Sequence, residues 1–122
     1  MRSSHAFAID ERAFQFGKSV ILFARPLFKT YDGRIIAQQL VRSATSIGAN
    51  IAEGQDASSR RQFSQYLQIA LRSARETRFW LRLADEIGSE RGNTVAGLQA
   101  EVGELIGILV ASVLKLKNTK NQ

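Results

Sequence analysis

Apolar residues recur at intervals of three and four along most of the chain, a spacing typical of amphipathic helices. The clearest case is a stripe that steps by four, four, three and four through Ile36, Leu40, Ala44, Ile47 and Ile51. Alternating apolar and polar residues, which would indicate strands, are scarce, and the chain has a single proline. The pattern therefore predicts an all-α protein.

Four segments have this periodicity. They cover approximately residues 10–28, 34–53, 59–87 and 94–117. Pro26 predicts a break at the end of the first segment, and Thr30 to Gly33 predict the connecting turn. Gly54 is the expected C-cap of the second helix, and Ser59 with Gln62 forms a capping box for the third. Because the connections are short, we expect one domain over residues 1–122, an antiparallel up-down four-helix bundle.

Composition limits the chemistry that the chain can perform. Its 122 residues include no cysteine and one histidine, His5. Thiol nucleophiles, cysteine-ligated zinc and a multi-histidine site within one subunit are therefore excluded. No glycine-rich phosphate loop is found either. We expect no catalytic residues, no metal, no cofactor and no enzymatic activity.

The longest apolar stretch also bears on location. Leu105 to Leu114 is ten residues long, whereas a helix that spans a membrane needs about twenty. We therefore expect a cytoplasmic protein that contacts no membrane.

Basic residues outnumber acidic ones by 17 to 11, giving a net charge of +6. Most of the cations are arginines, which form bidentate contacts with phosphate and carboxylate. On a helix of 100° per residue, all six arginines of the third segment fall within one sector of about 120°. These are Arg60, Arg61, Arg72, Arg75, Arg78 and Arg82. The sector is a candidate phosphate-binding stripe; the alternative is a solvated face whose arginines pair with acids of a neighbouring helix or subunit.

Three large apolar residues, Leu71, Phe79 and Leu83, fall in or beside this arginine sector and outside the core stripe. Apolar residues outside a core stripe indicate a second buried face, so we interpret them as a subunit interface. Scattered surface hydrophobes are the alternative. In the fourth segment, Gly103 and Gly107 form a small-xxx-small pair that predicts close approach of a neighbouring helix.

A line of polar residues follows the second segment through Arg42, Ser46, Asn50 and Glu53. A carboxylate, an amide and a guanidinium on one face could form an acid–base site. No nucleophile or metal-ligand set accompanies them, however, so we interpret the line as a structural hydrogen-bonding layer.

The string QLVRSATSIGANIAEG, over residues 39–54, is distinctive. It resembles the signature of bacterial four-helix bundle proteins encoded in intervening sequences of 23S ribosomal RNA genes. Residues 58–70 and 73–83 are similar to the third helix of that family, and the likeness covers about residues 10–117. The chain departs from the signature at Ser43, where a second arginine is usual, and at Gly48, which replaces a proline.

This resemblance implies an up-down four-helix bundle that assembles as a ring-like homopentamer and has no established enzymatic activity. The family is also similar to the accessory variability proteins of diversity-generating retroelements, basic pentameric barrels that bind a reverse transcriptase and nucleic acid. We therefore expect a non-enzymatic homo-oligomer that contacts RNA or another polyanion through its arginines. The alternative is a protein-interaction scaffold or adaptor, for example an accessory subunit of a reverse transcriptase.

Overall fold

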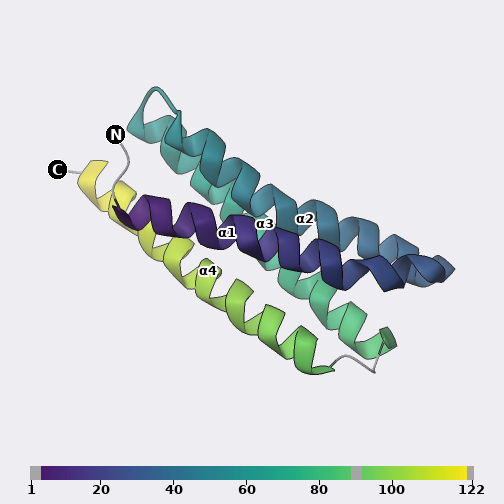
Figure 1. The fold of residues 1–122 in the computed structure, drawn as a ribbon. Helices are drawn as coiled ribbons and strands as arrows, with labels where there is room; N and C mark the ends of the chain where they lie inside the picture. The colour runs from purple at the N-terminus through teal and green to yellow at the C-terminus, as the bar shows by residue number, and fades with distance from the viewer. Residues whose placement is uncertain (1–3, 89–91, 121–122) are drawn as a thin grey trace.

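Four long helices make up the computed structural model, which describes residues 4–88 and 92–120 (Figure 1). They are α1 (Ser4–Ala24), α2 (Tyr31–Gln55), α3 (Arg60–Gly88) and α4 (Gly92–Lys120), with the short 3-10 helix η1 (Arg25–Lys29) between α1 and α2. Each long helix packs on its two neighbours in an up-down order, α1 on α2 and α4, and α3 on α2 and α4. No strand occurs in the described residues. The predicted all-α, four-helix fold is confirmed.

The core lies between the four helices and is formed by the predicted apolar stripes. All five stripe residues of α2 are buried. The other helices contribute buried residues at spacings of three, four and seven: from α1 Ala13, Phe16, Val20 and Phe23; from α3 Leu67, Ala70, Ala74, Leu81 and Ala84; from α4 Leu98, Val102, Leu105, Leu109 and Val113. Because the core residues of α3 are mostly alanines, α2 and α3 can approach closely, and their contact is the most extensive of the bundle.

Helix α1 differs from its predicted bounds at both ends. The helix begins at Ser4 rather than near residue 10, and Ile9 adds one more buried position to its apolar stripe. It ends before Pro26, as expected, but the chain continues as η1 instead of as an open turn. Thr30 is then the N-cap of α2, and its hydroxyl accepts a hydrogen bond from the Gly33 amide at 3.1 Å. The predicted turn at Thr30 to Gly33 is thus the capped first turn of a helix.

Two glycine predictions are wrong. Gly54 does not cap α2, since the helix continues to Gln55 and no described residue has a positive φ. A Cβ at Gly54 would lie 3.1 Å from Phe63 and Tyr66 of α3, so the glycine serves helix packing. Gly103 and Gly107 do not serve it, because a Cβ at either would meet no heavy atom within 4 Å in the described chain.

The capping box at the start of α3 has a modified form. The Ser59 hydroxyl accepts from the Gln62 amide at 3.1 Å, as predicted. The Gln62 side chain accepts from the amide of Ser58 at 2.8 Å, one residue earlier than in the usual box.

Helix α4 is more apolar than the stretch from Leu105 to Leu114 indicates. Over Thr94–Asn118 its length and mean hydropathy of 1.5 meet the criteria for a membrane-spanning helix, and 33% of that window is buried inside the bundle. The buried part is the core stripe already described. The remainder includes the half-buried Ile108 and Val110 and the exposed Leu114, whose large apolar side chains raise the hydropathy.

Candidate nucleic-acid interface

The arginine face of α3 is solvent-exposed along its whole length. It consists of Arg60, Arg61, Arg72, Arg75, Arg78 and Arg82, and each of these residues is exposed. Ion pairs among the described residues include those of Arg12 and Arg42, and none involves these six. Pairing with acids of a neighbouring helix therefore does not account for them within the subunit. The face offers six cations to solvent or to a partner.

Of the predicted apolar trio beside these arginines, one side chain is exposed to solvent and two are half-buried. Leu71 and Leu83 are half-buried and pack against the core, whereas the side chain of Phe79 is 54% exposed. The Phe79 ring lies against Trp80 in an edge-to-face arrangement, with 5.0 Å between ring centroids. The available apolar contact on α3 is therefore centred on Phe79, flanked by Arg78 and Arg82.

Trp80 belongs to a polar cluster that ties α3 to α2. Its indole N–H donates to Glu76 at 2.8 Å, and the Arg42 guanidinium donates to the same carboxylate oxygen. Arg42 also donates to Gln39 at 3.0 Å. One carboxylate of α3 thus holds two donors and orients the Phe79–Trp80 pair.

The predicted polar layer on α2 is divided by the structure. Asn50 donates to the backbone carbonyl and hydroxyl of Ser46, and the Ser73 hydroxyl of α3 donates to the same Ser46 hydroxyl at 2.9 Å. Arg42 instead pairs with Glu76, and Glu53 is exposed, with no side-chain hydrogen bond or ion pair in the described part of the chain. The four residues therefore do not form one layer.

A buried hydroxyl pair that was not predicted from the sequence lies at the α2–α3 contact. Ser43 and Thr77 are fully buried, and the Thr77 hydroxyl lies 2.9 Å from that of Ser43. Thr77 also contacts the Ser73 carbonyl at 2.7 Å, while Ser43 donates to the Leu40 carbonyl. Both hydroxyls are satisfied, which makes this pair the polar part of the core.

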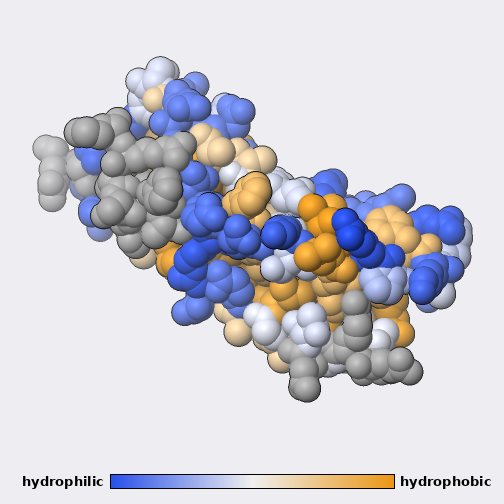
Figure 2. Space-filling view, viewed as in Figure 1, coloured by the Kyte–Doolittle hydropathy of each residue, from blue (hydrophilic) through white to orange (hydrophobic). Residues whose placement is uncertain are grey.

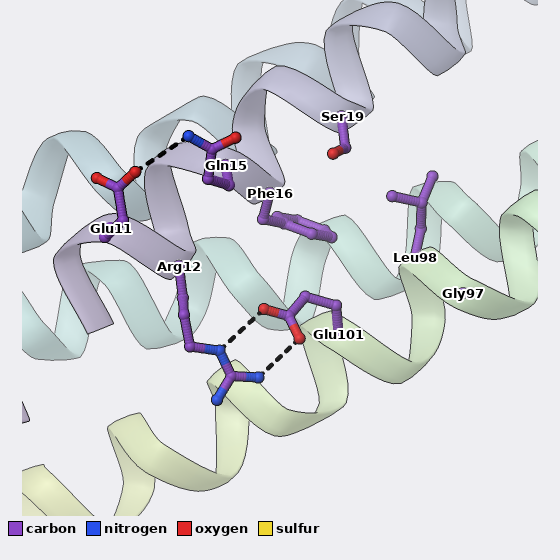
Figure 3. A pocket seen from close by; sticks show the side chains of 8 residues that line it. All are labelled: Glu11, Arg12, Gln15, Phe16, Ser19, Gly97, Leu98 and Glu101. Atoms are coloured by element: carbon purple, nitrogen blue, oxygen red, sulfur yellow. Dashed lines mark hydrogen bonds and ion pairs between the residues drawn. The ribbon is translucent and has the colours of Figure 1, made fainter. Parts of the chain in front are cut away.

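A hollow of about 590 Å³ lies between α1 and α4 (Figure 3). Arg12 of α1 reaches across to Glu101 of α4 in a bidentate contact at 2.7 and 3.1 Å, and it also contacts Glu104 at 2.9 Å. The hydrogen bond with Glu101 raises the pKa of Arg12 above its ordinary value. Phe16 and Leu98 extend into the space between the two helices. The cation here is satisfied within the chain, so the hollow offers no free cation to a ligand.

A second hollow, of about 580 Å³, lies between α1 and α2. Its floor contains Gly17 and Gly48, and its wall on α1 includes Phe14, whose side chain is 63% exposed, and Leu22. Apolar surface is also visible over α1 and α4, where it alternates with hydrophilic clusters (Figure 2). Phe14 and Leu22 were not singled out in the sequence, because their positions read as the outer side of α1.

The third hollow, of about 460 Å³, lies where the start of α3 meets the end of α4. Arg60 and Arg61 line it from α3 and Lys117 lines it from α4. Near the C-terminal end of its own helix, Lys117 also interacts favourably with the helix dipole. Its position beside two arginines follows from the antiparallel arrangement of the two helices.

The model of the 23S rRNA-intervening sequence protein family matches residues 6–111 of the chain. The chain belongs to this family. In the described residues, this family member has no group of three or more His, Cys, Asp or Glu side chains placed to hold a metal ion.

Among solved structures, this intervening-sequence protein is similar to a protein of unknown function from the S23 ribosomal protein family of Bacteroides thetaiotaomicron. The two share 27% sequence identity with a TM-score of 0.82, over 89% of this chain and 97% of the other. The comparison with curated proteins gives no match. The resemblance inferred from residues 39–54 is therefore confirmed at the level of family and fold.

Proposed function

We propose that this intervening-sequence protein is a non-enzymatic, cytoplasmic homo-oligomer whose α3 arginine face contacts RNA or another polyanion. The observation that supports this most is the exposure of six arginines on one helix without an acidic partner in the described chain. A row of cations on a rigid helix is suited to phosphates, which it contacts without reading base sequence. Association into a homopentamer, as the family resemblance implies, would repeat the face and raise avidity.

The first prediction tests the arginine face directly. Arg72→Glu combined with Arg75→Glu should weaken binding to single-stranded RNA of any sequence, because two phosphate contacts are lost. It should also flatten the slope of log affinity against log salt by about 1.4, since each contact with a single strand contributes about 0.7. Fluorescence anisotropy at several salt concentrations measures both quantities.

A matched control separates local contact from overall charge. Lys18→Glu combined with Arg25→Glu makes the same charge change on α1 and at the start of η1, where both residues are exposed. This control should bind RNA with nearly the wild-type salt slope. Equal weakening by the two double variants, or no weakening by either, would contradict a binding role for the arginine face.

A protein-interaction scaffold or adaptor, for example an accessory subunit of a reverse transcriptase, is the second candidate. The exposed Phe79 and its contact with Trp80 favour it, because aromatic residues beside arginines are typical of protein interfaces. In that case the arginines would meet an acidic protein surface. If the Arg72/Arg75 double variant binds RNA as tightly as the wild type at every salt concentration, this second function becomes the preferred one.

A further inference from the structure

The hollow between the start of α3 and the end of α4, which we call the α3/α4 pocket, concentrates positive charge. Arg60 and Arg61 come from the first turn of α3, and Lys117 comes from the last turns of α4. These segments are far apart in sequence but lie at the same end of the bundle (Figure 1). None of the three cations takes part in an ion pair in the described chain, and no carboxylate lines the pocket.

Intramolecular stability does not explain this arrangement. Lys117 is favourable near the C-terminus of α4, where the helix dipole attracts cations. Arg60 and Arg61 have the opposite relation to their own helix, because the dipole disfavours cations in a first turn. Bringing a third cation to the same pocket adds like-charge repulsion. An anion in the pocket would remove both unfavourable interactions.

The rest of the lining supplies neutral polar groups. Ser64, Gln65 and Gln68 follow Arg61 at helical spacings and line the same pocket. The Ser64 oxygen accepts a hydrogen bond from Gln68 at 3.1 Å, which leaves the Ser64 hydroxyl hydrogen available to donate. Gln65 contributes an amide with two further donors. Guanidinium, ammonium, hydroxyl and amide donors around one hollow fit the oxygens of a phosphate group.

The pocket is continuous with the arginine face. Arg61 belongs to both, and Arg72 and Arg75 follow on nearly the same side of α3, after the neutral residues of the pocket. A strand that lies along the face would therefore meet the pocket at one end. A terminal phosphate carries about −1.5 to −2 charges at neutral pH, so three cations favour it over an internal diester with a single charge.

We infer that the α3/α4 pocket binds a terminal phosphate, the monoester end of a nucleic-acid strand that lies along the arginine face. The inference rests on the proposed polyanion-binding function. A free phosphate ion has the same dianion chemistry and could occupy the same pocket. The two sources are distinguished by experiment.

The experiment compares one short single-stranded RNA with three kinds of end: a 5′-phosphate, a 3′-phosphate, or hydroxyls at both ends. We expect a phosphorylated end to raise affinity about tenfold over the hydroxyl form, as charge-assisted hydrogen bonds within the pocket are gained. Arg60→Gln combined with Lys117→Gln should abolish this preference. Arg72→Gln combined with Arg75→Gln removes the same charge outside the pocket, so it should weaken all three RNAs alike and keep the tenfold ratio.

Inorganic phosphate serves as the second probe. If it raises the melting temperature of the wild type but not of the Arg60/Lys117 variant, the pocket is a phosphate site even where no RNA binds, and only the proposed RNA function fails. If RNA binds with no preference for a phosphorylated end and inorganic phosphate has no effect, the inference is overturned while the proposed function stands. A preference that survives in the Arg60/Lys117 variant overturns it as well.

Discussion

The hydroxyls of Ser43 and Thr77 join α2 to α3 inside the core, and packing against α3 also decides which other polar residues of α2 have a partner. The pattern gave a polar line along α2, but one helix alone does not reveal which of its polar residues face a neighbour. Packing against α3 buries Ser43, brings Ser46 to Ser73, and leaves Glu53 exposed. The side on which α3 packs is set by tertiary contacts, so it could not be read from α2.

The Ser43–Thr77 contact predicts a specific loss of stability. Thr77→Val keeps the shape of the side chain and removes the hydroxyl that bonds Ser43 and the Ser73 carbonyl. We expect it to lower the free energy of unfolding by about 1 kcal/mol, the usual net contribution of an internal hydrogen bond. Thr45→Val is the matched control, because the Thr45 hydroxyl is exposed and bonds only carbonyls of its own helix. Urea unfolding in which the two variants have equal stability would contradict this role for Thr77.

At the scale of whole helices, apolar periodicity predicted the four helices and the buried stripe of α2 correctly, because periodicity depends only on local sequence. The helix junctions were less predictable. Pro26 indicated a break, but the 3-10 helix after it depends on Thr30, which caps α2, and on the backbone of Leu27, which lies against Gly33. Gly54 was misassigned as a cap for a similar reason, since its partners Phe63 and Tyr66 belong to the next helix.

The glycines of α2 and α4 predict opposite effects of the same substitution. A Cβ at Gly33 would lie 2.2 Å from the Leu27 carbonyl oxygen, so Gly33→Ala must displace the backbone of η1. We expect it to destabilise the fold by about 1–3 kcal/mol or more. Gly107→Ala meets nothing within 4 Å and should stabilise α4 by about 0.5–1 kcal/mol, because glycine lowers helix stability. Urea denaturation of both variants measures the two effects.

Either of two outcomes would contradict this account of the glycines. If Gly33→Ala unfolds at the wild-type urea concentration, the contact between η1 and α2 does not constrain the fold. If Gly107→Ala is destabilising, the outer side of α4 must pack against something other than its own chain.

At the scale of the molecule, the six arginines were predictable as a face because they lie on one helix. The α3/α4 pocket was not, because Lys117 joins Arg60 and Arg61 only after α3 and α4 fold against each other. The apolar surface shows the same limit. The structure leaves Phe79 exposed on α3, as the sequence suggested, and exposes Phe14 beside the α1–α2 hollow. These two aromatic residues lie on different helices and define two possible subunit contacts.

The last prediction decides which contact forms the proposed homo-oligomer. We expect the mass of the wild type from light scattering to be a multiple of the 13.5 kDa subunit, and five subunits are what the family resemblance implies. We expect the mass of Phe79→Asp to be that of a monomer. An aspartate at the centre of an interface is a buried, unpaired charge, which costs several kcal/mol at each contact. Phe14→Asp makes the same change at the α1–α2 hollow and should leave the assembly intact. Both side chains are more than half exposed in the subunit, so neither substitution should unfold it.

Dissociation by Phe14→Asp alone would move the interface to α1 and α2 and free the arginine face from any role in subunit contact. A monomeric wild type at tens of micromolar would rule out the oligomer itself, and polyanion binding would then depend on the six arginines of a single subunit.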